Sequence, residues 1–517
     1  MSRFVRCVAI FCALAGACVR ADVKLPAVIS DNMALQQGQP VPIWGWADAG
    51  EDVSVTFAGQ TKTAKAGEDK KWSVTLDALK VGEPAELTVK GKNTIVVMNV
   101  IVGEVWVCSG QSNMEFGINN ANNAKDEIAN AKFPKIRLFT VKKKVSDVPV
   151  YDCEGKWTEC SPETINGFTA VGYFFGRKLH QELNVPVGLI HTSWGGTPIE
   201  AWMSPEALGK DADFKPILER YAQAKAQDTP ENWTLKMDKH KAEMEKWKLI
   251  AAKAKAEGQP APRAPRQPQH IPNSNSPSAL YNAMIVPILP YAIAGSTWYQ
   301  GEANAGRAYQ YRKLLPGLIA DWRTAFACMN SSFMVVQLAN FMDRKPEPSE
   351  SAWAELREAQ TMAALNVPKT GIGLAIDIGD AKDIHPKNKQ DVGARLALQA
   401  LKISYGKNIP FSGPLYDSFK SDGSKAVVNF KYAFGGLKAK DGELKGFAVA
   451  GEDKKFVWAT AKIEGDTVVV SSDKVARIAA VRYAWADNPE ANLYNGSDLP
   501  AVPFRSDSWP GITEGKN

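Results

Sequence analysis

The segment that decides the predicted fold is Val102–Met114, with the sequence VGEVWVCSGQSNM. Its first seven residues are mostly apolar, as in a strand that is buried on both faces of a parallel sheet. The polar turn that follows contains Gly110 and leads into a helix-compatible stretch. A strand that runs into a glycine turn and then a helix exposes side chains at the carboxyl edge of the sheet. Ser112 is therefore a candidate nucleophile.

Strand-like and helix-like segments alternate around this segment. Apolar runs predict strands at 95–98, 135–140, 187–190, 293–299, 333–337 and 371–378. Amphipathic patterns predict a helix over 172–183 and another after Pro386, with Val392, Leu396, Ala400 and Ile403 on one face. This alternation indicates an α/β domain with a largely parallel sheet, which we place at residues 101–411.

Two flanking regions and one insertion have other patterns. Residues 22–100 and 412–517 contain short alternating runs separated by turns, such as Val41–Trp46 and Ala426–Phe430, which is typical of β-sandwiches. A stretch at about 208–276 begins rich in Ala, Lys and Glu and ends rich in proline. Because acidic residues interleave with its lysines, we expect solvent-facing helices there.

The first 21 residues have the pattern of a secretory signal peptide. Two arginines precede an apolar stretch from Val8 to Ala17, which is followed by small residues up to Ala21. We expect cleavage near Ala21 and a secreted or periplasmic protein, with lipid attachment at Cys18 as the less favoured alternative. No later apolar run is long enough for a membrane span. A net charge of +6 over 517 residues gives no case for nucleic-acid binding.

Four cysteines lie beyond this signal peptide. Cys153 and Cys160 flank a short polar loop, and an exported protein can form disulfides, so these two are candidates for a pair. Cys108 lies in an apolar run and is expected to be a buried thiol. No C-x-x-C spacing is present, and the sequence therefore predicts no metal site.

Histidine is the usual base that activates a serine, and the chain has only five. They are His180 in a predicted helix, His191 at a strand end, His240 in the insertion, His270 in the proline-rich stretch, and His385. His385 stands between the last strand and the helix after Pro386, at the rim where α/β enzymes place their sites. The alternative is that His385 only caps that helix.

Two more polar turns follow predicted strands. Thr192–Thr197 reads TSWGGT, and Trp298–Ala305 reads WYQGEANA. A glycine pair lets a backbone N–H approach a ligand closely, and the amide of Asn304 can donate to a developing oxyanion. Together with Ser112 and His385, these turns form a set suited to acyl transfer.

Five segments resemble the sialate O-acetylesterase family, a branch of the SGNH hydrolases. They are Gly110–Met114, Gly195–Trp202, Ser276–Met284, Gln300–Ala305 and Asp383–Pro386, spread over about 100–405 in the expected order. The resemblance implies a flavodoxin-like three-layer domain with a parallel sheet, flanked by β-sandwich domains. It also implies hydrolysis of acetyl esters on sugars such as sialic acid, without a metal or organic cofactor.

The resemblance assigns roles to individual residues. Ser112 attacks the ester carbonyl, and His385 takes the serine proton and later passes it to the leaving sugar oxygen. The oxyanion is held by the backbone N–H of Ser112, by that of Gly196 (with Gly195 a close alternative) and by the Asn304 amide. The candidate contacts with substrate are Gln111, Trp194, Gln300 and Glu302.

The acid that orients the histidine departs from the pattern of the wider group. Lys382 occupies the position three residues before His385, where an aspartate is usual. We predict Asp383 as the orienting acid, with Asp380, Glu302 or a Ser–His dyad without an acid as alternatives.

Three other functions remain open on the sequence. An esterase acting on acetylated xylan or another polysaccharide fits the same motifs. A glycan-binding protein with a decayed catalytic centre would also use tryptophans such as Trp202 and Trp298, if these were not core residues. A peptidase or lipase has less support, because the G-x-S-x-G turn and a long apolar lid are missing from the sequence. The sequence gives no oligomeric state.

Overall fold

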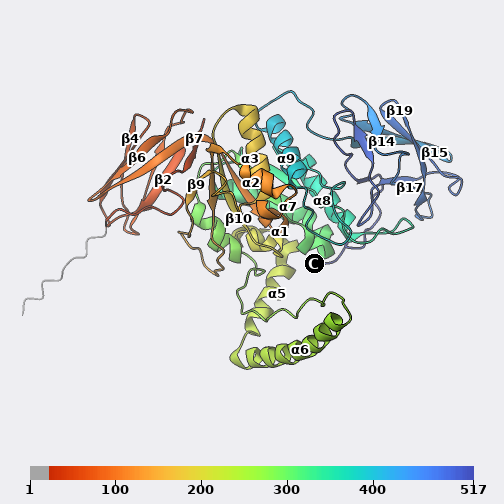
Figure 1. The fold of residues 1–517 in the computed structure, drawn as a ribbon, viewed down its shortest axis with the longest axis horizontal. Coiled ribbons are helices and arrows are strands. Elements are labelled where there is room, and N and C mark those ends of the chain that lie inside the picture. The colour runs from red at the N-terminus through yellow and green to blue at the C-terminus, as the bar shows by residue number, and fades with distance from the viewer. Residues whose placement is uncertain (1–21) are drawn as a thin grey trace, which may run out of the picture.

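The computed structural model describes residues 22–517, and the predicted signal peptide lies outside these residues. The protein is a mixed α/β structure with one large mixed sheet of eleven strands and four smaller sheets in the described part. Figure 1 shows the N-terminal strands at one end, the helices around the large sheet in the middle, and the C-terminal strands at the other end.

The large sheet is organised around a central strand, β7 (Thr94–Gly110). The strand order is β13 (Thr370–Gly373), β12 (Ser332–Val336), β11 (Gly295–Tyr299), β7, β10 (Val187–Ser193), β8 (Phe133–Thr140) and β9 (Trp157–Cys160). All neighbours pair in parallel except β8 and β9. The turns that follow β7, β10 and β11 therefore meet at the same edge of the sheet.

Helices from the crossover connections pack beside this sheet. Helix α3 (Ala170–Leu183) contacts α9 (Lys389–Ile403), and α7 (Ala308–Ala325) contacts α8 (Ala352–Asn366). Val392, Leu396 and Ala400 of α9 are fully buried, as the sequence pattern predicted. Asn388 caps α9 by accepting the N–H of Asp391, so the helix begins three residues after Pro386 and His385 is not its cap.

β7 is longer than the sequence suggested, since one continuous strand replaces two expected ones. Its first part pairs with β6 (Ala85–Lys90), while its last part lies in the parallel sheet. The register shifts near Asn99, whose φ is +56°. A bulge of this kind bends a strand without ending it, so β7 runs through the boundary expected near residue 100.

The other N-terminal strands form two groups. β2 (Val41–Trp46) pairs with β5 (Lys71–Leu76), and β3 (Asp52–Phe57) pairs with both β4 (Gln60–Lys65) and β6. β1 (Ala34–Gln36) pairs in parallel with β7. The buried residues of these strands belong to the same apolar core as the central sheet.

The C-terminal strands have a core of their own. One sheet has the order β14 (Leu415–Asp422), β15 (Lys425–Lys431), β20 (Thr467–Ser471), β19 (Thr460–Glu464). Another has the order β18 (Val457–Trp458), β17 (Phe447–Ala450), β21 (Ala480–Tyr483), β23 (Phe504–Arg505), and β16 (Leu437–Ala439) pairs with β22 (Leu493–Asn495).

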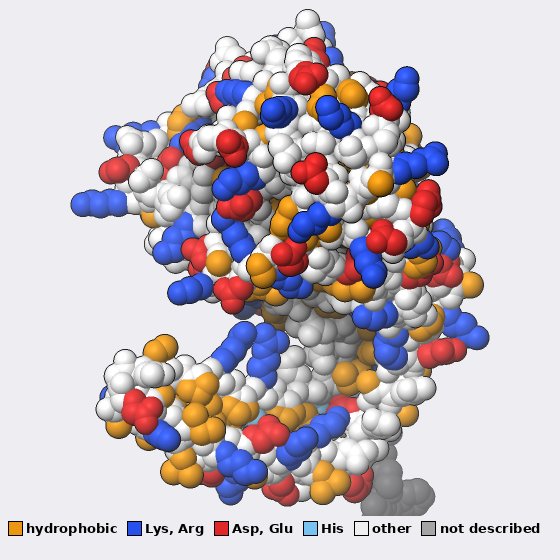
Figure 2. Space-filling model, turned by 90° about the vertical axis from the view of Figure 1, so that its right-hand side faces the viewer, with side chains coloured by type: hydrophobic (Ala, Val, Ile, Leu, Met, Phe, Trp, Pro, Cys, Tyr) orange, Lys and Arg blue, Asp and Glu red, His pale blue; other side chains and the backbone are white. Residues whose placement is uncertain are grey.

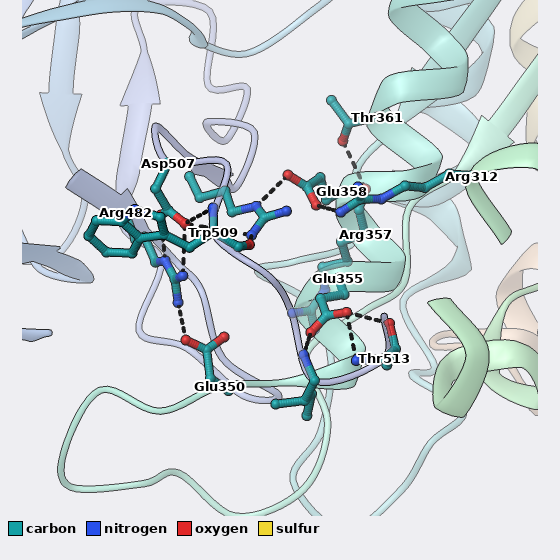
Figure 3. A network of polar contacts seen from close by, with 12 residues as sticks. Arg312, Glu350, Glu355, Arg357, Glu358, Thr361, Arg482, Asp507, Trp509 and Thr513 are labelled. Atoms are coloured by element: carbon teal, nitrogen blue, oxygen red, sulfur yellow. Dashed lines mark hydrogen bonds and ion pairs between the residues drawn. The ribbon is translucent and has the colours of Figure 1, made fainter. Parts of the chain in front are cut away.

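Polar contacts fasten the C-terminal segment to α8 (Figure 3). Glu355 accepts the backbone N–H groups of Ile512 (2.6 Å) and Thr513 (3.1 Å). Glu358 pairs with Arg312 of α7 (2.6 Å) and with Arg505 (2.8 Å). The last strands are therefore joined to the helices of the central region.

Two helices project from the central region after residue 214. They are α5 (Lys215–Ala226) and α6 (Pro230–Ala256), and α6 contains no buried residue. Figure 1 shows α6 well separated from the sheet, and in Figure 2 a hollow separates a lower lobe, with mixed charged and apolar side chains, from the main body.

The four described cysteines are free thiols, so the pair considered for Cys153 and Cys160 does not form. Cys160 is buried at the end of β9 with its Sγ 3.9 Å from the carbonyl of Ala131, whereas Cys153 lies in the preceding loop. Burial raises the pKa of both thiols to about 12. Among residues 22–517, no helix combines the length and apolar character of a membrane span, and no three His, Cys, Asp or Glu side chains cluster as metal ligands would.

Candidate active site

The serine turn is built by a glycine at the end of β7. Gly110 has a φ of +138°, and a Cβ there would lie 2.2 Å from the carbonyl oxygen of Tyr299, so no other residue fits. Gln111 follows in an extended conformation, and Ser112 is the first residue of the short helix α1 (Ser112–Glu115). Ser112 is thereby placed, partly exposed, at the carboxyl edge of the sheet.

His385 lies directly against Ser112. The ring atom Nε2 is 2.9 Å from Ser112 Oγ, although the two residues are 273 positions apart in the chain. The imidazole stacks on Phe116 with the ring centroids 6.5 Å apart, and about a third of the side chain is exposed. With its proton on Nδ1, the ring can accept the serine proton through Nε2.

Of the three acids considered for the histidine, Asp383 is the one that touches it. Asp383 Oδ1 accepts the backbone N–H of His385 (2.9 Å) and lies 3.4 Å from Nδ1. Asp380 instead accepts the backbone N–H groups of Lys382 and Asp383, which shapes the loop. Glu302 is bonded to Asn113. The Asp383 side chain is half exposed, so solvent screens its effect on the ring.

The glycine pair after β10, Gly195 and Gly196, lies beside Ser112. A Cβ on Gly195 would lie 3.2 Å from Ser112 Cβ, so this turn passes close to Ser112. However, the N–H of Gly195 is donated to Glu115 Oε2 (2.6 Å). The N–H of Gly196, at a φ of +76°, has no acceptor within residues 22–517. Of the two glycines, Gly196 therefore has the donor that remains available for an oxyanion.

Asn304 lies in the turn after β11 and is 1% exposed. Its Oδ1 accepts from Ile199 N (3.0 Å) and from Gln300 Nε2 (2.7 Å), while Nδ2 donates to Glu200 Oε2 (2.9 Å). These contacts fix the orientation of the amide. Its second N–H has no partner among the described residues.

Known proteins resemble this chain over most of its length. A family model described as "Carbohydrate esterase, sialic acid-specific acetylesterase" matches residues 102–235 and 270–402. The chain belongs to this family. It is a carboxylic ester hydrolase of the carbohydrate-esterase type.

Individual relatives match over nearly the whole chain. Sialate O-acetylesterase of Rattus norvegicus is 31% identical, with 92% of each chain covered, and that of Homo sapiens is 30% identical, with 94% of each covered. The crystal structure of a carbohydrate acetylesterase from Xanthomonas citri is 36% identical and has a TM-score of 0.79, covering 94% of this chain and all of that one.

Two predicted substrate contacts of this acetylesterase lie instead beneath the site. Gln300 is 0% exposed, and its amide bonds to Thr197 O, Asn304 Oδ1 and the Tyr311 hydroxyl. Gln111 is 3% exposed, and its Oε1 accepts the N–H groups of Gly301 and Ala303, each at 3.3 Å. Both glutamines hold neighbouring turns together, which is a positioning role.

Glu302 is also turned inward. Its Oε1 accepts from Asn113 Nδ2 (2.7 Å), whereas Oε2 is buried without a partner among the described residues. Burial raises the pKa of this carboxyl group. These contacts hold Glu302 against Asn113, next to Ser112 in the chain, while the residue as a whole is partly exposed; its contact with substrate stays a prediction.

Trp194 is the predicted substrate contact that remains accessible. It is half-buried, and Lys143 Nζ lies 5.3 Å from its ring while forming a 2.5 Å ion pair with Glu115. Trp202 and Trp298 are fully buried and belong to the core. Trp194 therefore gives this enzyme an aromatic surface next to the Gly195 turn.

Sequence reasoning missed two buried residues at the site, Asn113 and Lys389. Both lie at helix starts, where a polar residue is usually solvent-exposed, so the sequence carried no signal for their burial.

Proposed function

We propose that this protein removes O-acetyl groups from sugars, in the first place sialic acids, through a covalent acetyl-serine intermediate. The observation that carries the proposal is the 2.9 Å contact between Ser112 Oγ and His385 Nε2 in a member of a carbohydrate-esterase family. A decayed centre that only binds glycans would have no need to keep this contact.

In the proposed reaction, His385 accepts the proton of Ser112 as Oγ attacks the acetyl carbonyl. The oxyanion is stabilised by the N–H groups of Ser112 and Gly196 and by the amide of Asn304. His385 then protonates the departing sugar oxygen, which leaves acetyl-Ser112. His385 then takes a proton from water as the water oxygen attacks the acetyl carbon, and it returns this proton to Oγ as the C–Oγ bond breaks, which releases acetate and restores the serine.

We further propose a three-layer SGNH-type domain at 101–411, with the helical insertion at about 208–276, between β-sandwich domains at 22–100 and 412–517. The pairing of α3 with α9 and of α7 with α8 supports the layers, and the family match omits residues 236–269. Because we propose that residues 1–21 are a signal peptide, we also propose that the protein is secreted or periplasmic.

A second candidate substrate is an acetylated polysaccharide such as xylan. The Xanthomonas carbohydrate acetylesterase is 36% identical to this chain, compared with 30–31% for the human and rat sialate relatives. The test is NMR of acetylated sialic acids and acetylated xylo-oligosaccharides during turnover. Loss of the sialate acetyl signal supports the first substrate, and loss of only the xylan signals supports the second.

Asp383→Ala is expected to lower kcat by roughly 10-fold, far less than the ~10⁴-fold loss seen when a buried triad aspartate is changed. The reason is that Asp383 is half exposed and 3.4 Å from the ring. Acetate release by Asp383→Ala, Asp380→Ala and Glu302→Ala should be measured side by side. Equal, small losses in all three variants would show a Ser–His dyad.

Trp194→Ala is expected to raise KM for a sugar ester by about 10-fold and to change kcat little, because a stacking surface for the sugar is lost. A suitable control is Trp458→Ala, which removes an indole that is 43% exposed in β18 of the C-terminal region. Steady-state kinetics on one acetylated sugar checks both variants. A fall in kcat at unchanged KM would refute a binding role for Trp194.

A further inference from the structure

A lysine is fully buried beneath the Ser112–His385 pair. Lys389, the first residue of α9, is 0% exposed, and its Nζ donates to Asn113 Oδ1 at 2.5 Å. The same nitrogen lies 4.8 Å from the ring centroid of Phe116 and 5.2 Å from that of Tyr299. Lysine is almost never buried to this extent, because its charge loses hydration, so its place here needs an explanation.

Asn113 connects the loops that carry the two reacting side chains. It follows Ser112 in the chain, is 1% exposed, and its Nδ2 donates to the carbonyl of Ile384 at 3.0 Å. Ile384 immediately precedes His385. The same Nδ2 donates to Glu302 Oε1 at 2.7 Å. One carboxamide therefore holds three turns, those after β7, after β11 and before α9.

We propose that Lys389 is a positioning residue, which acts through Asn113 to keep Ser112 Oγ and His385 Nε2 at reacting distance. The oxygen and nitrogen of a carboxamide have nearly the same shape, so packing alone does not fix which one faces Ile384 and Glu302. Lys389 is a donor only, and it therefore selects the orientation in which Oδ1 faces Nζ and Nδ2 faces the two acceptors. This inference rests on the proposed roles of Ser112 and His385.

The charge of Lys389 is set by the groups around it. Burial lowers its pKa to about 7, and the carboxylates of Glu302 and Asp383 oppose that shift. Burial raises the pKa of Glu302, while Tyr299, whose pKa is raised well above 10, stays neutral. Above pH 7 Lys389 loses its proton, which weakens its bond to Asn113. The arrangement therefore predicts a decline of kcat on the alkaline side.

The test compares Lys389→Met with Lys387→Met, an exposed lysine of the same loop. We expect Lys389→Met to lower kcat by roughly 10²-fold at nearly constant KM, because a small misplacement of reacting groups costs about this much. Lys387→Met should keep the kcat and KM of the wild type. Lys389→Arg should retain more activity than Lys389→Met and lose the alkaline decline, because arginine stays charged.

A second readout needs no sugar. The rate at which an organophosphate labels Ser112 should fall in parallel with kcat in Lys389→Met, whereas a residue that only stabilises the fold would leave this rate unchanged in the folded fraction. If Lys389→Met does not fold, Asn113→Ala gives the same test. In folded protein, the double variant Lys389→Met/Asn113→Ala should lose no more kcat than either single variant.

The outcomes separate the two proposals. If Ser112→Ala is inactive while Lys389→Met and Asn113→Ala keep the wild-type kcat, labelling rate and pH profile, the positioning role is overturned and the proposed function stands. If Ser112→Ala keeps full activity, both are overturned. A loss of kcat and of the labelling rate in Lys389→Met and Asn113→Ala, but not in Lys387→Met, supports the positioning role.

Discussion

Ser112→Ala is expected to lower kcat for acetyl-ester hydrolysis by at least about 10⁴-fold and to leave KM and the fold nearly unchanged. Without Oγ no acetyl-enzyme forms, and the remaining oxyanion donors can only assist direct attack by water. His385→Ala should cost about as much, since Oγ then has no base within 2.9 Å. The double variant should be no worse than either single variant, because the two groups act as a unit. Acetate release from p-nitrophenyl acetate and from an acetylated sugar measures all three.

The chain supplies a matched control for this experiment in a second serine–histidine contact. His191 Nε2 lies 2.6 Å from Ser193 Oγ, but both residues are buried at the end of β10. Burial lowers the pKa of His191 to about 4, so the ring is neutral at pH 7 and cannot easily take up a proton. We expect the kcat of Ser193→Ala to stay within a few-fold of the wild-type value. A large loss of kcat in Ser193→Ala, together with an active Ser112→Ala, would show that Ser193 in β10 is the nucleophile instead of Ser112.

Ser112 and His385 could be selected from the sequence because each follows a strand of one parallel sheet, and the carboxyl ends of such strands share an edge. The roles of Gln111 and Gln300 could not be predicted. A polar residue in a turn that follows a strand suggests contact with substrate, whereas these side chains bond to groups far away in the chain, Gln111 to Gly301 and Gln300 to Thr197. Which turn covers which side chain depends on packing, which periodicity does not encode.

The same dependence on packing explains why the burial of Lys389 and the length of β7 could not be predicted. Lys389 lies in a polar run, Lys387–Gln390, that resembles an exposed helix start, and only the loops around Asn113 bury it. In β7 the sequence predicted two separate strands, at 95–98 and from residue 102, with Asn99 between them. A bulge with a left-handed Asn99 keeps the strand continuous, and asparagine is one of the few residues that tolerate this conformation.

The second large effect is expected at Arg357, on the α8 face where the C-terminal region is attached (Figure 3). Its guanidinium is 0% exposed and donates to four backbone carbonyl groups. Two of them, Leu338 O (2.8 Å) and Ala339 O (2.8 Å), follow β12; the other two, Ala486 O (2.7 Å) and Asp487 O (2.9 Å), follow β21. One side chain therefore fastens the C-terminal sheet to the edge of the central sheet.

This attachment continues toward the catalytic histidine. Asn340, next to the two carbonyls after β12, donates to Asn488 Oδ1 (2.8 Å) and accepts the N–H of Gly379 (2.7 Å). Phe341 forms a β-bridge with Asp380, which begins the loop that leads to His385. Loosening the C-terminal contact at residues 486–488 should therefore also loosen the histidine loop.

Arg357→Met is expected to reduce the free energy of unfolding by about 4 kcal/mol, because four buried carbonyl groups lose their charged donor. The control is Arg344→Met at the same junction, where the ion pair with Glu490 (2.9 Å) is half exposed and should contribute less than about 1 kcal/mol. Urea titration of both variants gives the comparison, and kcat of the folded proteins shows whether the histidine loop is affected. Arg357→Lys should lie between wild type and Arg357→Met, since one ammonium group cannot reach all four carbonyls. Equal, small losses in Arg357→Met and Arg344→Met would mean that apolar packing, rather than the guanidinium, holds the C-terminal region in place.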